Sequence, residues 1–84
     1  MRAVERIGEP IRVAAVFEPG RPVRPVWFDW QRRKHTVTRV TYCWQGRAGE
    51  HTLLYFAVSD GSDLFELVYD TVDQGWTLDG VEAN

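Results

Sequence analysis

The chain has 84 residues, of which 44% are hydrophobic and 26% charged, and these proportions indicate one globular domain over residues 1–84. No apolar run approaches the roughly 20 residues of a membrane-spanning helix, and residues 1–8 lack the apolar stretch of a signal peptide. Cys43 is the single cysteine, so a disulfide within the chain is excluded. We therefore expect a cytoplasmic protein with no membrane partner.

The charges divide sharply between the two halves of the sequence, although the net charge is only −2. Residues 1–47 hold all ten Lys and Arg residues and four carboxylates, which gives +6, whereas residues 48–84 hold eight carboxylates and no Lys or Arg, which gives −8. Such asymmetry is one sign of a nucleic-acid or membrane partner. The alternative is that the two halves interleave as neighbouring strands and their charges pair across a sheet.

The first two predicted elements are strands joined by a turn. Residues 10–17 alternate apolar and polar side chains, and residues 18–22 hold the Pro and Gly residues of a turn. In residues 23–30, alternation places Phe28 and Trp30 on one face and Trp27 on the other. Pro25 lacks a backbone donor, which predicts an edge or a bulge at that point.

The third element covers residues 35–44, which are rich in β-branched and aromatic side chains. Its apolar phase changes between Val37 and Val40, so we predict a bulge near residues 38–39. Tyr42 and Trp44 would then share the core face with Val40. The polar tip before this strand, residues 31–34, contains no Gly or Asn, and a tight primed turn is not predicted there.

Three further strands follow, over residues 51–59, 64–70 and 76–81, and the Asp-Gly pair at residues 60–61 marks a turn between the first two. Residues 1–8 and 82–84 show no strong pattern, and we expect them to be loosely ordered. Short strands joined by hairpin turns predict an all-β fold. We favour a small, strongly twisted antiparallel barrel of six strands, SH3-like, with aromatic side chains filling its core.

Catalytic and metal chemistry have little support in this sequence. Cys43, His35 and His51 lack the spacing of a zinc site. Cys43 could act with His51 as a nucleophilic pair, and aspartates gathered at turns could act as acids or bases, which leaves a hydrolase as the alternative. The simpler interpretation treats Cys43 as a small apolar residue and the aspartates as turn formers. We expect no enzyme, no cofactor and no metal site.

A group of cations around one hairpin is the strongest functional feature. Arg32, Arg33 and Lys34 form its tip, Arg21 and Arg24 precede it, and Arg39 follows. Cations that follow phosphates, beside a ring that stacks on bases, suit single-stranded nucleic acid. The predicted binding residues are Arg21, Arg24, Trp27, Arg32, Arg33, Lys34 and Arg39. The alternative is a solvated tip whose Trp27 belongs to the core.

Two blocks of residues carry a resemblance to a known family. The first is Glu9-Pro10-Ile11, then Phe28-x-Trp30-x-x-Arg33-x-His35-x-Val37-x-x-Val40-x-x-x-Trp44; the second is Tyr55-x-x-x-x-Asp60-Gly61, Phe65-x-Leu67-x-x-Asp70 and Gly75-Trp76-x-Leu78-x-Gly80. They resemble a bacterial family of uncharacterised small domains. A similar unit forms the C-terminal end of the Y-family-polymerase-like protein of a damage-induced mutagenesis cassette.

The resemblance implies association with DNA-repair proteins and no catalytic residues. The chain departs from the family at Arg32, where the family usually has Gly, and at His35, where an aromatic residue often stands. We expect a non-enzymatic binding module whose partner is single-stranded nucleic acid or a DNA-repair protein. The alternative is a protein-interaction domain without nucleic-acid contact, or a homodimer, formed through an exposed strand edge.

Overall fold

The computed structural model describes residues 4–83, and they form seven strands in one antiparallel sheet. The strands are β1 (Val4–Val16), β2 (Arg24–Trp30), β3 (Arg33–Thr36), β4 (Arg39–Ala48), β5 (His51–Ser59), β6 (Leu64–Asp70) and β7 (Gly75–Glu82). Their order across the sheet is β3-β2-β1-β7-β6-β5-β4. The predicted all-β class is confirmed. Among the described residues there is no helix of a length and apolarity suited to crossing a membrane.

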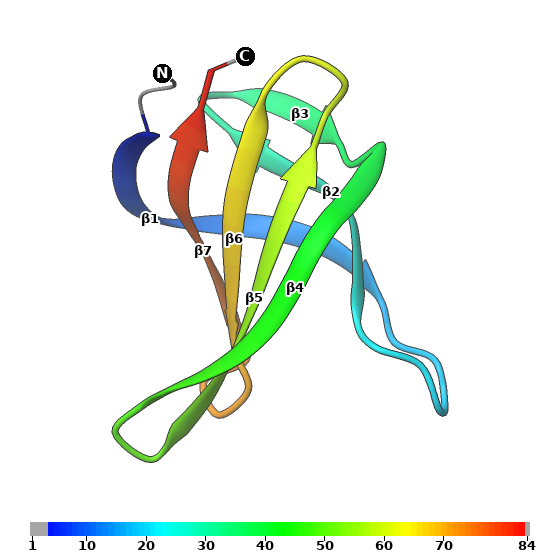
Figure 1. Cartoon of the computed structure of the whole chain (residues 1–84), viewed down its shortest axis with the longest axis vertical. Helices are drawn as coiled ribbons and strands as arrows, with labels where there is room; N and C mark the ends of the chain where they lie inside the picture. The colour runs from blue at the N-terminus through cyan, green and yellow to red at the C-terminus, as the bar shows by residue number, and fades with distance from the viewer. Residues whose placement is uncertain (1–3, 84) are drawn as a thin grey trace.

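The predicted six-stranded closed barrel is wrong, because the sheet has two edges. Within the described residues, β3 is hydrogen-bonded only to β2, and β4 only to β5. In Figure 1, β4 to β7 form one layer, and β1 bends behind it to carry the β2–β3 hairpin. The two edges meet where the chain passes from β3 to β4: the amide of Val37 donates to the Val26 carbonyl at 2.9 Å and the amide of Thr38 to the Ser59 carbonyl at 2.8 Å. Elsewhere between β3 and β4 the sheet stays open.

The seventh strand arises because the predicted third element is two strands. β3 ends at Thr36, and the chain crosses to the other edge of the sheet before β4 begins at Arg39. The change of apolar phase between Val37 and Val40 therefore marks this crossing. A bulge does follow, but at Thr41, since Val40 pairs with Val58 and Tyr42 pairs with Ala57.

The bulge at Thr41 reverses the predicted faces of β4. Cross-strand partners share a face of a sheet, and Cys43 pairs with the buried Phe56, so Cys43 lies on the core face of β4, although it remains exposed at this edge of the sheet. Tyr42 and Trp44 point outward, against expectation. Tyr42 is 64% exposed, and Trp44 stacks on its partner Tyr55 with ring centroids 5.0 Å apart.

β1 is longer than the sequence indicated. Its first half, from Val4, pairs with β7, and its second half pairs with β2. Residues 4–8 and Glu82, which we expected to be loosely ordered, are therefore in strands, and Ala83 follows the last strand. Residues 1–3 and 84, to which the same expectation applied, lie outside the described part of the chain. The irregularity expected at Pro25 is confirmed, because the register of β1 and β2 shifts between Ala14 and Ala15, beside it.

The core lies between the layer of β5 to β7 and the β2–β3 hairpin. Its buried hydrophobic side chains are Phe28, Phe56, Val58, Phe65, Leu67 and Leu78. The ring of Phe28 stacks on His35 with centroids 5.0 Å apart and meets the edge of Phe65 at 5.0 Å. The aromatic core is smaller than predicted, since Phe17 is 61% exposed.

Candidate binding surfaces on the basic side of the sheet

Most cations of the first half have no carboxylate partner within residues 4–83. Nη1 of Arg6 lies 3.6 Å from Oε1 of Glu66 and 3.8 Å from Oδ2 of Asp79. Nη2 of Arg12 lies 2.6 Å from Oδ2 of Asp29. The exposed cations that form no ion pair among the described residues are Arg21, Arg24, Arg32, Arg33, Lys34, Arg39 and Arg47. They lie on the β1–β2 loop, the β2–β3 hairpin and β4. In this part of the chain, cross-sheet pairing of early cations with late carboxylates is therefore limited to Arg6.

The tip of the β2–β3 hairpin is a two-residue turn. Trp30 pairs with Arg33, and the residues between them, Gln31 and Arg32, have φ values of 53° and 61°. Two successive positive φ values are the mark of the primed turn that suits the twist of a hairpin. Sequence reasoning missed this turn because the usual Asn-Gly signal is absent. The turn exposes three cations, Arg32, Arg33 and Lys34, called here the basic hairpin.

Trp27 lies on the outer face of β2, opposite the buried Phe28, as the alternation predicted. The Nζ atom of Lys34 is 4.9 Å from the centroid of the Trp27 ring, and the guanidinium carbon of Arg12 is 5.4 Å from it. Arg12 in turn holds Asp29, the register partner of Lys34. Trp27 is thus half-buried beneath two cations, and an anionic ligand would meet those cations before the ring.

A second group of cations surrounds an opening between β4 and the segment of residues 21–24. The largest hollow there has a volume of about 410 Å³, and Cys43, Leu54 and Phe56 contribute to its lining. An adjoining hollow of about 240 Å³ shares Cys43 with it, and a third of about 210 Å³ is lined by Arg24 and Arg39 among others. We call this row of hollows along β4 the seam groove.

The predicted single basic patch is therefore two surfaces. Arg21, Arg24 and Arg39 belong to the seam groove, and Arg32, Arg33 and Lys34 lie with Trp27 on the hairpin. The seven residues of β2 separate the two groups by about 20 Å, at roughly 3.3 Å per residue. A ligand on one group need not touch the other.

Cys43 is exposed within the seam groove and lies far from His51 along the ladder. Its partner on β5 is Phe56, whereas His51 pairs with Ala48. Five positions of β5 separate Phe56 from His51, which amounts to about 16 Å. The structure does not bring the thiol and this imidazole together.

His51 instead hydrogen-bonds Asp70, with 2.8 Å between Nδ1 and Oδ2. This hydrogen bond raises the pKa of His51 despite partial desolvation, and it lowers the pKa of Asp70. Asp73 lies within 4.8 Å of both groups, so the three side chains could approach one cation. The other oxygen of Asp70 already accepts from the amides of Val72 and Asp73. The sequence did not reveal this cluster because it depends on the β5–β6 register.

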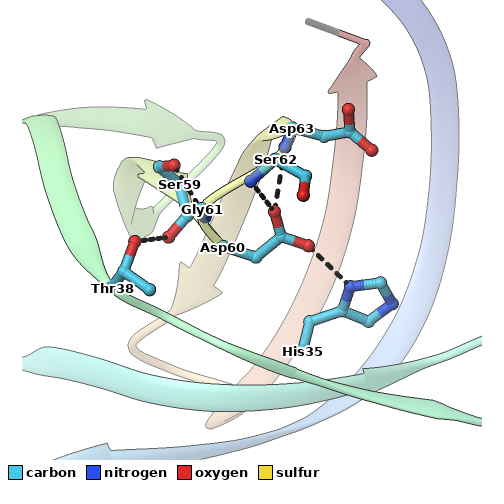
Figure 2. A network of polar contacts seen from close by, with 7 residues as sticks. All are labelled: His35, Thr38, Ser59, Asp60, Gly61, Ser62 and Asp63. Atoms are coloured by element: carbon cyan, nitrogen blue, oxygen red, sulfur yellow. Dashed lines mark hydrogen bonds and ion pairs between the residues drawn. The ribbon is translucent and has the colours of Figure 1, made fainter.

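His35 has a structural role in the arrangement that Figure 2 shows. Its side chain is 8% exposed, and its Nδ1 lies 3.1 Å from Oδ2 of Asp60 in the β5–β6 turn. Oδ1 of Asp60 accepts from the amides of Ser62 and Asp63, both at 2.9 Å. Burial acts to raise the pKa of Asp60, but the hydrogen bonds from Asp63, Ser62 and His35 outweigh it, and the pKa is lowered. These contacts, the turn latch, tie edge strand β3 to the opposite layer.

Comparison with known proteins gives no further assignment: no family model, no curated protein and no solved structure matches the chain.

Proposed function

We propose that this protein is a non-enzymatic binding module that holds single-stranded nucleic acid on its basic hairpin. One observation carries the proposal: the seven exposed cations without ion-pair partners in residues 4–83 gather on the β1–β2 loop, the hairpin and β4. The carboxylates of the second half lie on β6, on β7 and in the three turns between β4 and β7. The hairpin therefore presents a locally positive surface that attracts a polyanion despite the net charge of −2.

The hairpin can engage phosphates without first breaking an ion pair. Arg32 and Arg33 are exposed, and the nearby carboxylates have other partners: Asp29 binds Arg12, and Glu9 accepts from the Trp30 indole at 3.2 Å. Phosphate contacts make affinity fall as salt is added, with a slope of roughly −0.7 per phosphate for single strands. Three hairpin cations therefore correspond to a slope of about −2.

The proposed setting is DNA repair, and it draws on the resemblance to a mutagenesis-cassette domain. Two charge-reversed variants separate the hairpin from the rest of the basic side. The hairpin variant is Arg32→Glu with Arg33→Glu, which leaves Lys34 on Trp27; the seam variant is Arg21→Glu with Arg24→Glu. Each changes the net charge by −4, from −2 to −6, so they serve as matched controls.

Fluorescence anisotropy with labelled single- and double-stranded oligonucleotides, over a series of salt concentrations, tests the proposal. We expect the hairpin variant to bind single strands about tenfold or more weakly and to reduce the salt slope by about 1.4, since two phosphate contacts are lost. The seam variant should stay within about threefold of the wild type, because its cations lie some 20 Å away. Absence of binding at low salt, or equal loss in both variants, would overturn the proposal.

A further inference from the structure

We infer that the seam groove is a docking site for an extended, acidic polypeptide segment of a partner protein, which pairs with the free edge of β4. The inference is independent of nucleic-acid binding at the basic hairpin, because different residues form the two surfaces. It rests on three features of the groove: backbone groups without a ladder partner, apolar walls and unpaired arginines at the rim.

The first feature is the edge of β4 itself. Among residues 4–83, β4 is hydrogen-bonded to β5 and to no other strand, so alternate residues direct their N–H and C=O groups away from the sheet. The stretch from Arg39 to Gln45 borders the groove along its length. Seven residues extend about 23 Å, and the bulge at Thr41 interrupts the run, so an added strand would pair regularly from Tyr42 onward.

The second feature is the apolar surface beside that edge. Cys43, Leu54 and Phe56 line one side of the 410 Å³ hollow, and Pro22 and Val23 line the other. A strand added to β4 would point every second side chain toward these walls. Apolar side chains at alternate positions of the incoming segment would therefore be buried in the groove.

The third feature is the charge at the rim. Arg21 and Arg24 lie on the wall facing β4, and Arg39 begins β4. All three are exposed and form no ion pair with any residue from 4 to 83, and Glu18, in the middle hollow, is the one carboxylate among the described lining residues. Carboxylates near the ends of the segment complement this rim.

Two other occupants fit less well. A second copy of the chain would bring two β4 edges together, each carrying Arg39 and Arg47, and like charges across strands oppose pairing. A nucleic acid has no peptide backbone to continue the ladder, and its phosphates gain nothing from the apolar walls. An acidic strand satisfies the edge, the walls and the rim together.

The test uses Cys43, the single cysteine, as a reporter inside the groove. The probe is a synthetic peptide of about eight residues, Val and Thr in alternation between two Glu residues at each end. One control peptide has Lys in place of Glu, and another has N-methylated amides that cannot donate to a strand edge. The rate of Cys43 alkylation by iodoacetamide is measured in the presence of each peptide and, separately, in the presence of oligo-dT.

We expect the acidic peptide to slow alkylation about a hundredfold at a concentration one hundred times its Kd, since about 1% of the protein then remains free. The N-methylated and Lys-containing peptides should not protect the thiol. The seam variant should bind the acidic peptide at least about tenfold more weakly, whereas the hairpin variant should bind it normally. This pattern is the reverse of that expected for nucleic acid.

Several results would overturn the inference. They are a Cys43 that the acidic peptide leaves unprotected at millimolar concentration, equal protection by the N-methylated peptide, or protection by oligo-dT in preference to the peptide. A wild-type protein whose Cys43 is already shielded by dimerisation would also overturn it, and sedimentation without peptide detects that case. Loss of oligonucleotide binding in the hairpin variant with peptide binding intact would leave both proposals standing.

Discussion

Arg32 holds a backbone conformation that favours glycine, and it does so at the exposed tip of the basic hairpin. Its φ is 61°, and Gln31 before it has a φ of 53°. The left-handed region costs a residue with a Cβ atom roughly 1–2 kcal/mol. A glycine would avoid this cost but would remove a cation from the tip. Backbone strain of this kind is commonly found where a side chain is needed for function.

We predict that Arg32→Gly stabilises the fold. Relief of the left-handed strain should raise the free energy of unfolding by about 1 kcal/mol, which raises Tm by roughly 4–8 °C in a domain of this size. Thermal unfolding followed by circular dichroism measures the effect. Arg47→Gly, which removes an equal charge from within β4, should instead lower the free energy of unfolding by about 0.5–1 kcal/mol. Shifts of the same sign in both variants would contradict this account.

The pair of His51 and Asp70 predicts a pH dependence of stability. The pKa of His51 is raised from 6.5, so its contribution is complete below 6.5 and is lost as pH rises through the folded-state pKa. The pKa of Asp70 is lowered from 3.8, so its contribution is complete above 3.8 and is lost as pH falls through the folded-state pKa. The advantage of the wild type over His51→Gln should therefore be greatest between those limits.

Urea unfolding of the wild type and His51→Gln across the pH range measures this window. A proton NMR titration of His51 gives its folded-state pKa directly. The difference in unfolding free energy should shrink as pH is raised through that value. A difference that stays constant from acid to alkaline pH would show that the pair contributes nothing through its charges.

Edge strand β3 depends on contacts outside its own hairpin. It has four residues and one strand neighbour, β2, and its buried side chain, His35, lies between Phe28 and Asp60. The turn latch is therefore expected to hold β3 against the opposite layer. Without it, β3 would be an ordinary frayed edge.

We predict that Asp60→Ala lowers the free energy of unfolding by about 2–3 kcal/mol. The substitution leaves the buried His35 without its carboxylate and removes the acceptor for two turn amides. Hydrogen exchange of Val37 and Thr38 amides should quicken more than exchange in β6. Asp73→Ala, at an exposed position of the next turn, should change stability by no more than about 0.5 kcal/mol. Equal effects of the two substitutions would exclude a latch.

Local alternation explains which parts of this fold were predictable. It placed Phe28 and Trp30 on one face of their strand and Trp27 on the other, and Phe28 is buried, because two-residue periodicity is a property of each strand alone. The crossing at residues 37–38 and the bulge at Thr41 both shift the alternation of apolar and polar side chains. A crossing and a bulge change this alternation in the same way, so the sequence alone does not distinguish them. The faces of Tyr42 and Cys43 were therefore predicted wrongly.

The site was predictable in part for the same reason. The cations of the basic hairpin follow from their position at a turn, which is local. The separation of Arg21, Arg24 and Arg39 into the seam groove depends on where β4 lies relative to the β1–β2 loop, which is long-range. His51 and Asp70 likewise come together only through the register of β5 and β6.

One edge of the sheet is β4, and the charges along this edge predict whether the protein self-associates. Two copies paired through their β4 edges would bring the cations of one edge, Arg39 and Arg47, close to those of the other, and we predict that this like-charge repulsion keeps the wild type monomeric. Arg39→Glu removes part of this repulsion and brings a carboxylate near the cations of the other copy. Each opposite-charge pair contributes about 0.2–1 kcal/mol, and removal of repulsion contributes a similar amount. Over two symmetry-related contacts this totals about 0.8–4 kcal/mol, and at 1.4 kcal/mol for each factor of ten, self-association should strengthen at least about fourfold. Sedimentation velocity measures it, and Arg32→Glu, an equal charge change away from the edge, should remain monomeric. A dimeric wild type would contradict this prediction, because the β4 edge would then already pair with a second copy of the chain.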